Sequence, residues 1–195
     1  MNDLLLIGDV HGNVNSYWKI LQKHKKKSIQ LGDFGFKWEH QWHLNTLYSD
    51  LHKVCFGNHD DPSFLKSPHS LGDYSFLEEY SLMSIRGAFS IDKVVRTEGK
   101  DWWPNEEMNY EEMSNCVDFF IKKKPKIVVS HDCPNHVREE FFFIKDKSLT
   151  TNAMQLMLEF HKPDLWVFGH HHKYHSKTIN GTKFICLTEL GTLLI

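Results

Sequence analysis

Five short segments of the sequence combine aspartate, asparagine and histidine in patterns that suit metal binding. They read GDVHG (8–12), GDFG (32–35), GNHD (57–60), SHD (130–132) and GHHH (169–172). The candidate ligands within them are Asp9, His11, Asp33, Asn58, His131, His170 and His172. Carboxylates, imidazoles and an amide oxygen suit divalent ions such as Mn, Fe, Zn or Ni.

The number and spacing of these residues indicate how they would bind. Seven ligands are too many for one tetrahedral ion, but they suffice for two ions that share a carboxylate. The absence of cysteine from the five segments argues against a closed structural zinc site. Asp9 and His11 are two residues apart, as are His170 and His172, so each pair points to one side of an extended chain. His171 then points away, and a metal site needs it least.

Each of the five segments follows a short apolar run that predicts a buried strand. The predicted strands cover residues 4–8, 28–32, 53–57, 126–130 and 165–169. Apolar residues at helical spacing lie between several of them, which indicates an α/β fold with parallel strands. Because the site of an open α/β sheet lies beyond the carboxyl ends of its strands, the five segments should converge in space.

The rest of the chain predicts further helices and some antiparallel strands. Helices are expected from Val14, over residues 44–51, after a cap at Asn109, and after a cap at Thr150 or Thr151. Strands are expected at residues 75–82 and 83–91, and at 174–179 and 183–188 around an Asn180-Gly181 hairpin turn.

Length and composition restrict the class of protein. A chain of 195 residues is long enough for one buried core, so we expect a single domain over residues 1–195. The net charge of −2 lacks the basic excess of a nucleic-acid-binding protein. No apolar stretch approaches the roughly 20 residues of a membrane span, and the N-terminus lacks the pattern of a signal peptide. Four widely spaced cysteines without a CxxC pair predict reduced thiols and a cytoplasmic protein.

The order of the five segments resembles that of the calcineurin-like metallophosphoesterase superfamily, and residues 85–104 resemble its small bacterial and phage members. The resemblance covers residues 8–172 and includes all five segments. It implies a four-layer α/β/β/α sandwich of two mixed sheets flanked by helices, with a dinuclear metal site at the strand C-terminal ends. One metal ion would bind Asp9, His11, Asp33 and His172, and the other would bind Asp33, Asn58, His131 and His170.

The resemblance also implies catalytic roles. His59 would protonate the leaving oxygen, and Asp60 would orient the His59 ring. Two ions about 3.5–4 Å apart can hold a water and lower its pKa from about 15.7 toward about 7, which supplies hydroxide at neutral pH. An imidazole is suited to donate a proton to the leaving group near pH 7.

Two departures bear on the substrate. Ser/Thr protein phosphatases of the superfamily carry Asp-Arg-Gly after the second segment and an arginine before Gly-Asn-His. Here the second segment continues as GDFGFKW and Phe56 precedes Gly57, so both arginines are absent from the sequence. This disfavours a protein phosphatase.

Residues 85–104 contain three candidate substrate contacts: Arg86, Arg96 and Trp103. Arginine binds phosphate as a planar fork, and a tryptophan could stack against a base or sugar. A tryptophan that only fills space under a loop is the alternative.

We therefore expect a phosphoesterase with two divalent ions, manganese first and Fe, Zn or Ni as alternatives. Monoesters and diesters are both open. A small phosphorylated substrate such as a nucleotide or cyclic nucleotide is favoured, because the short chain leaves no room for a large recognition domain. The alternatives are a Ser/Thr-type protein phosphatase and a non-catalytic metal-binding scaffold, and the presence of all seven ligands and His59 argues against the scaffold. No feature of the sequence predicts an oligomeric state.

Overall fold

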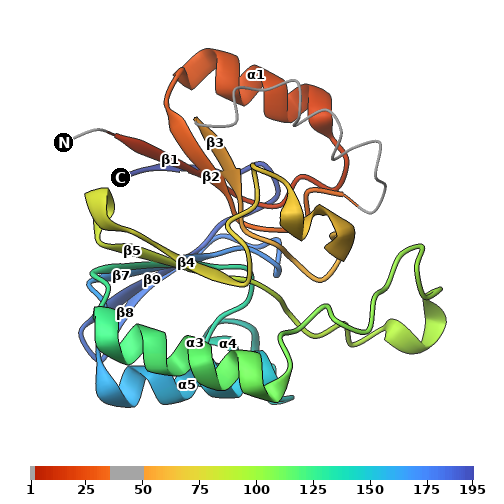
Figure 1. The fold of residues 1–195 in the computed structure, drawn as a ribbon. Helices are drawn as coiled ribbons and strands as arrows, with labels where there is room; N and C mark the ends of the chain where they lie inside the picture. Colours follow the sequence, from red (N-terminus) through yellow and green to blue (C-terminus); the bar gives the residue numbers. More distant parts are fainter. Residues whose placement is uncertain (1–2, 36–50) are drawn as a thin grey trace.

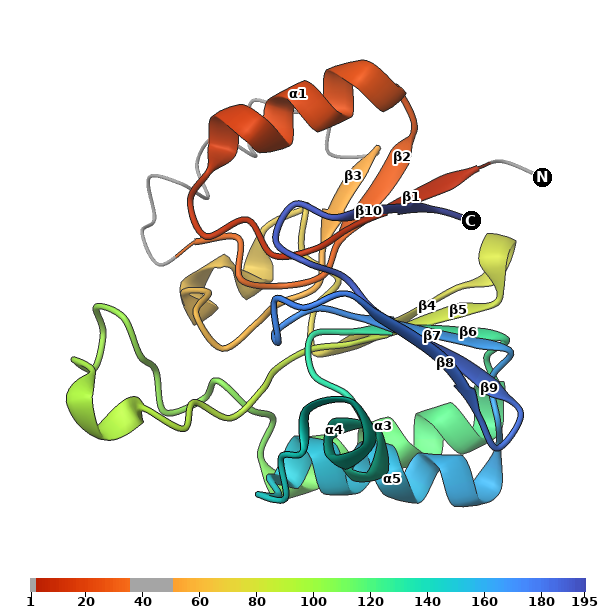
Figure 2. The same cartoon turned by 180° about the vertical axis from the view of Figure 1, so that it is seen from behind.

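The computed structural model describes residues 3–35 and 51–195, and its first sheet holds the N-terminal strands (Figure 1). The strand order is β10 (Thr192–Leu194), β1 (Leu4–Ile7), β2 (Lys27–Gln30) and β3 (His52–Val54). The strands β1, β2 and β3 are parallel, while β10 runs antiparallel to β1. Figure 2 shows β10 and β1 side by side, so the two ends of the chain meet in this sheet.

The second sheet has six strands and carries the rest of the site. Their order is β4 (Tyr74–Leu77), β5 (Leu82–Ile85), β6 (Ile127–Ser130), β7 (Leu165–Phe168), β9 (Thr182–Cys186) and β8 (His175–Ile179). The four central strands run parallel, and β4 and β8 are antiparallel edges. Asn180 and Gly181 both have positive φ, at 50° and 95°, as the predicted hairpin turn requires.

Helices cover the outer face of each sheet (Figure 1). The helices are α1 (Val14–His24), α3 (Tyr110–Lys123), α4 (Asn135–Phe142) and α5 (Leu149–Phe160). Short 3-10 turns lie at η1 (Pro62–Lys66), η2 (Glu78–Tyr80) and η3 (Lys93–Val95). α1 packs on the first sheet, and α3, α4 and α5 pack on the second. The predicted sandwich of two mixed sheets flanked by helices is confirmed.

Alternating side chains of the strands build the layers. In β1, Leu4 and Leu6 pack between the two sheets, while Leu5 and Ile7 pack toward α1. In β7, Val167 faces the space between the sheets and its neighbours face the helices. Both faces of these strands are therefore apolar, which is why they read as continuous apolar runs in the sequence.

The structure corrects several predicted boundaries. The strands expected at 75–82 and 83–91 are replaced by β4 and β5, because the η2 turn follows Leu77 and the chain leaves the sheet after Ile85. Residues 86–109 then extend from the body of the molecule toward α3 (Figure 2). The helix expected over 44–51 lies almost wholly outside the described residues.

Two elements were not predicted. β10 is only three residues long and too short for a periodicity signal. α4 has a weak apolar pattern, in which Val137 and Phe141 are its buried apolar residues. None of the helices in residues 3–35 and 51–195 combines the length and apolarity that a membrane span needs.

The cap of α5 also differs from the prediction. The Asn109 cap of α3 is confirmed and forms a capping box with Glu112. At α5 the capping residue is Ser148 rather than Thr150 or Thr151, and its hydroxyl accepts from the Thr151 backbone N–H at 3.2 Å. Thr151 completes the box from the third helical position.

We expect Ser148→Ala to lower the free energy of unfolding by about 1 kcal/mol, because it removes this N-terminal cap. Chemical denaturation measures the change. Ser114→Ala is the matched control, since Ser114 is exposed within α3 and alanine has the higher helix propensity. A Ser148 variant as stable as the Ser114 variant would contradict the assignment of the cap.

Candidate metal centre

The five predicted segments meet where the two sheets come together. Asp9 follows β1, Asp33 follows β2, and Asn58 follows β3 in the first sheet. In the second sheet, His131 follows β6 and the GHHH segment follows β7. Among the described residues, ligand atoms lie within 4.8 Å of one another in three groups; one of them, Asp132, Cys133 and His171, includes no predicted ligand, and the other two consist of predicted ligands. These two are Asp9, His11, Asp33 and His172, and Asp33, His131 and His170.

The first group points its ring nitrogens at one another. The Nε2 atoms of His11 and His172 are 2.9 Å apart, and His172 Nε2 is 3.1 Å from Asp9 Oδ2. His11 Nε2 also lies 3.8 Å from an oxygen of Asp9 and of Asp33. Two imidazole nitrogens and two carboxylates thus face one small space, which is the donor set that a divalent cation needs.

The second group is built around His131. Its Nε2 lies 3.3 Å from Asp33 Oδ1 and 3.1 Å from Asn58 Oδ1. Its Nδ1 faces the Leu31 carbonyl oxygen at 2.8 Å and must donate to it, so Nε2 is the atom free to bind a metal. The ring of His170 lies edge-on to that of His131, with centroids 4.9 Å apart. Asp33 belongs to both groups and contributes one oxygen to each side.

The backbone at these residues is unusual. His11, Asp33, His170 and His172 all have positive φ, at 45°, 54°, 65° and 55°. Non-glycine residues rarely adopt this left-handed conformation, and strain of this kind concentrates at functional sites. Four of the seven candidate ligands therefore adopt a backbone that the structure must hold in place.

Glycines before the ligands leave space for them. A Cβ on Gly57 would lie 2.2 Å from Asp33 Oδ1 and 2.7 Å from His131 Nε2. A Cβ on Gly169 would lie 2.1 Å from Asp9 Oδ1. The Gly-Asn and Gly-His pairs of the sequence are thus required by close packing of the ligands as well as by turn geometry.

The electrostatics favour a cation. Burial opposes ionisation of Asp9, but the nearby imidazoles of His11 and His172 outweigh it and lower the pKa of Asp9 to about 2. Burial favours the neutral ring of His131, yet the charge of Asp33 overrides it and raises the pKa of His131 to about 10. Burial lowers the pKa of His170 to about 3, so its nitrogen is unprotonated and available. The buried carboxylates attract positive charge that a metal ion would supply.

Asp60 accepts hydrogen bonds from the backbone around Asp33 and Gly57. Its two oxygens accept backbone N–H groups of Asp33 at 2.8 Å, Phe34 at 2.7 Å, Gly35 at 3.2 Å and Gly57 at 2.8 Å. Four backbone N–H groups thus share the two oxygens of this carboxylate. Asp60 thus holds the loop that presents Asp33, and its role in orienting the His59 ring stays a prediction.

His59 lies at the mouth of the site. Its backbone N–H donates to Asp33 Oδ1 at 2.9 Å, and its Nε2 is 3.3 Å from Arg96 Nη2. Arg96 is held by Asp92 through two bonds of 2.7 Å. Arg96, His59 and His170 line a cavity of about 320 Å³ that opens over the site. Arg96 thus lines a cavity beside the candidate metal ligands, and its contact with substrate stays a prediction.

The other two predicted substrate contacts lie elsewhere. Arg86 is 4 % exposed, and it binds Asp73 Oδ1 at 2.5 Å and the Asn105 carbonyl oxygen at 2.9 Å. Its guanidinium anchors residues 105–106 to the end of β5, and Arg86 is not among the residues that line the cavity, so its contact with phosphate stays a prediction without support from this geometry. Trp103 is half-buried and is not among the residues that line the cavity.

The sequence did not reveal the residues that hold the GHHH segment in place. His171 points away from the two groups, as expected, and its Nε2 lies 3.2 Å from Asp132 Oδ1 while its ring stacks on Phe142 at 4.0 Å. Arg138 of α4 lies behind Asp132 and also lines the cavity. The sequence offered one indication of a role for Arg138: the chain has only three arginines, and Arg138 is the third.

We expect Gly57→Ala to lose bound metal, because its methyl group would overlap Asp33 and His131, and to lose about 1–3 kcal/mol of stability through overpacking. Elemental analysis of the purified variant measures the metal. Gly72→Ala is the matched control: nothing lies within 4 Å of its Cβ, and only its φ of 69° is unfavourable. Equal metal content in both variants would contradict the close-packing argument.

We also expect metal binding to release a proton from His131. Below its pKa of about 10 the ring is protonated in the metal-free protein, so an ion must displace that proton. If one proton is released, the apparent affinity for the metal should fall about tenfold each time the pH is lowered by one unit. Calorimetric titration in two buffers of different ionisation enthalpy measures the release. A binding heat that is the same in both buffers would contradict it.

Comparisons with known proteins agree with this geometry. The family model of the calcineurin-like phosphoesterases matches residues 3–174. No curated protein matches the sequence significantly.

Three solved structures share the fold at low sequence identity. A dimetal phosphatase from Danio rerio has a TM-score of 0.59 at 14% identity, over 97% of this chain and 88% of its own. A phosphopantetheinyl hydrolase from Mycobacterium tuberculosis has a TM-score of 0.53 at 11% identity, over 96% and 90%. A Staphylococcus aureus protein provisionally described as a 5′-nucleotidase has a TM-score of 0.55 at 14% identity, over 98% of this chain but only 50% of its own.

The family model covers most of the 195 residues, and the Asp and His residues of the five segments assemble into groups that could hold metal ions. The chain therefore belongs to the calcineurin-like phosphoesterase family, which supports a metal-dependent phosphoester hydrolase.

Proposed function

We propose that this protein hydrolyses phosphate monoesters or diesters with two divalent metal ions, manganese being the first choice. The observation that carries the proposal is Asp33, whose carboxylate belongs to both groups of ligand atoms. One ion would be held by Asp9, His11, Asp33 and His172, and the other by Asp33, Asn58, His131 and His170. When bound, such ions supply Lewis acidity and a water of lowered pKa.

The chain's own residues prepare the site for this chemistry. Asp60 accepts the backbone N–H of Asp33, and the backbone N–H of His59 donates to the Asp33 carboxylate. The carboxylate that the two ions would share is therefore fixed before substrate binds. The His131 ring is locked by the Leu31 carbonyl with Nε2 facing inward. These contacts remove the cost of reorganising the ligands during the reaction.

His59 and Arg96 are placed to act on the substrate. The His59 imidazole would donate a proton to the leaving oxygen, and the Arg96 guanidinium beside it would bind a phosphoryl oxygen. Burial lowers the pKa of His59, with the Arg96 charge also lowering it. A lowered pKa makes the imidazolium a stronger acid but leaves less of it at neutral pH, so the proton transfer should be faster below neutral pH.

The cavity favours a small substrate. Its volume of about 320 Å³ is at the low end of ligand pockets, and Phe89, Ile91 and Ile144 give it an apolar wall. A nucleotide or cyclic nucleotide has a phosphate for the metal centre and an apolar base for this wall. The similar Staphylococcus aureus structure is described as a nucleotidase, which supports the same class.

Two alternatives are weaker. A Ser/Thr-type protein phosphatase would need an arginine after the second segment and another before Gly57. Here the second segment continues as GDFGFKW and Phe56 precedes Gly57, so both arginines are missing. A non-catalytic metal-binding scaffold would not need His59 beside Arg96 at the mouth of the cavity. Four free buried cysteines support a reducing compartment, and we propose the cytoplasm.

The proposal is tested by hydrolysis of para-nitrophenyl phosphate and bis(para-nitrophenyl) phosphate side by side. The protein is stripped with chelator and restored with manganese. We expect activity on at least one ester that is lost with chelator and falls at least about a hundredfold in Asp33→Asn. Asp118→Asn, an exposed aspartate of α3, is the matched control and should retain full activity. Binding of two metal equivalents without turnover of these esters or of a nucleotide panel would favour the scaffold.

The role of His59 has its own test. His59→Ala should slow alkyl phosphate esters by about 10²–10⁴-fold, because their leaving alkoxides need a proton. Nitrophenyl esters should be affected much less, since nitrophenolate leaves without one. The ratio of kcat/KM for the two ester classes measures the role. An equal loss for both would show that His59 acts in binding rather than as the acid.

A further inference from the structure

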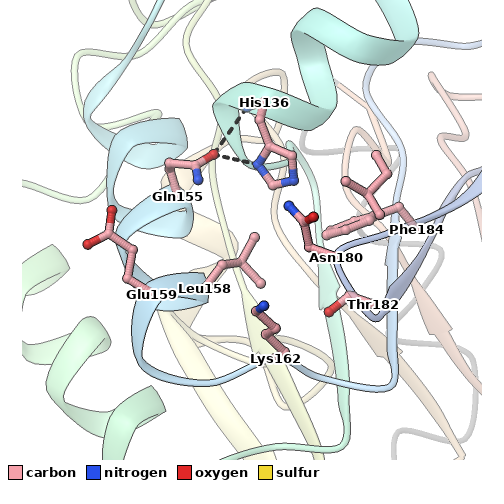
Figure 3. Close-up of a pocket in the computed structure, with 9 residues that line it drawn as sticks. His136, Gln155, Leu158, Glu159, Lys162, Asn180, Thr182 and Phe184 are labelled. Atoms are coloured by element: carbon pink, nitrogen blue, oxygen red, sulfur yellow. Dashed lines mark hydrogen bonds between the residues drawn. The ribbon is translucent and has the colours of Figure 1, made fainter.

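A second cavity lies between α4, α5 and the β8–β9 hairpin, apart from the metal centre (Figure 3). It has a volume of about 310 Å³. Its floor is apolar, with Leu158, Ile179 and Phe184. Figure 3 shows polar groups of His136, Lys162, Asn180 and Thr182 facing the same space. None of the acid–histidine groups found among the described residues includes a residue of this cavity.

The His136 ring presents an unpartnered nitrogen. The Gln155 amide oxygen Oε1 accepts a hydrogen bond from the His136 backbone N–H at 3.1 Å and lies 2.6 Å from His136 Nδ1. A backbone N–H only donates, so this amide atom must be the oxygen, and Nδ1 must carry a hydrogen. The other nitrogen, Nε2, is buried without a hydrogen-bond partner.

Thr182 presents a second unpartnered group. Its side chain is 1 % exposed, and its hydroxyl has no hydrogen-bond partner in the structure. A buried hydroxyl without a partner is destabilising, and a valine of the same shape would avoid that cost. We therefore expect the Thr182 hydroxyl to donate a hydrogen bond to a molecule bound in the cavity.

Charge decides the class of that molecule. Lys162 is an exposed residue that lines the cavity, and Figure 3 shows its ammonium and the Thr182 hydroxyl directed into the same space. Glu159 also lines the cavity, but Figure 3 shows its carboxylate on the far side, away from Lys162. An ammonium and a hydroxyl are donors to an oxyanion, while the apolar floor suits a short hydrocarbon part.

We propose that this cavity binds a small organic anion. Its carboxylate or phosphate group lies against Lys162 and Thr182, and its apolar part lies on Leu158 and Phe184. The proposal does not depend on the activity assigned to the metal centre. The two sites share α4, since His136 faces this cavity and Arg138 lines the other one. A ligand here would thus contact the helix that supports the metal centre.

The test uses butyrate, acetate and inorganic phosphate as probes, titrated into the full-length ¹⁵N-labelled protein. NMR follows the His136 imidazole nitrogens and the Thr182 amide, so binding here is separated from phosphate binding at the metal centre. We expect saturable shifts at both residues. Tighter binding of butyrate than of acetate would assign the carboxylate with an apolar tail, and a preference for phosphate would assign a phosphate group. No saturable shift with any probe would overturn the proposal.

Variants separate binding from packing. Lys162→Gln should weaken butyrate binding about tenfold, as expected for loss of one charge-assisted contact. Lys147→Gln, an exposed lysine outside the cavity, is the matched control and should bind as wild type does. Thr182→Val should also weaken binding, yet raise the Tm of the ligand-free protein because it removes an unpartnered hydroxyl. Unchanged affinity in Lys162→Gln, or a lowered Tm in Thr182→Val, would contradict the assignment.

Discussion

The buried carboxylate of Asp33 is the point on which the rest of the structure depends. It is 1 % exposed, has a positive φ, and lies in both groups of candidate metal ligands. A buried charge of this kind is costly unless it is paired and hydrogen-bonded. Here the imidazole of His131 lies next to the carboxylate, and the backbone N–H of His59 donates a hydrogen bond to it. Asp60 accepts the backbone N–H of Asp33 and so holds the loop. In the proposed centre, two ions would supply most of the compensating charge.

The fold serves this carboxylate by bringing two sheets to one edge. The first sheet supplies Asp9, Asp33 and Asn58 from three parallel strands, and the second supplies His131 and the GHHH segment. The apolar layer between the sheets holds their strand ends together at this edge. Packing of ordinary aliphatic residues thus sets the distances between ligands that lie more than 150 positions apart in the sequence, such as His11 and His172.

The alternation of strands and helices and the convergence of the five segments could be predicted from local patterns, whereas the sandwich of two sheets and the division of the ligands into two sets were expected only from the resemblance to the family. Each ligand comes directly after an apolar strand, and parallel strands end at a common edge. The roles of Asp60 and Arg86 could not be predicted in the same way. Asp60 is adjacent to His59 in the sequence, but its partners are the backbone N–H groups of residues 33–35 and of Gly57. Arg86 looks like a phosphate ligand until Asp73 and the Asn105 carbonyl are seen to bind it.

The second cavity shows the same limit. His136 and Thr182 are separated by 46 positions, and each reads alone as an ordinary helix or strand residue. Only the packing of α4 and α5 against the β8–β9 hairpin brings them to one space (Figure 3). Sites that form along one edge of a sheet can be anticipated from strand ends, whereas sites between layers depend on contacts that no local pattern encodes.

The central claim is that one carboxylate is shared by two metal ions. Electron paramagnetic resonance of the protein loaded with manganese tests this directly, because two Mn²⁺ ions joined by a bridging ligand are magnetically coupled. The account predicts a coupled-pair spectrum for the wild-type protein that changes to the signal of isolated ions in Asp33→Asn. A wild-type protein that binds two equivalents of manganese but gives only the isolated six-line signal would contradict it.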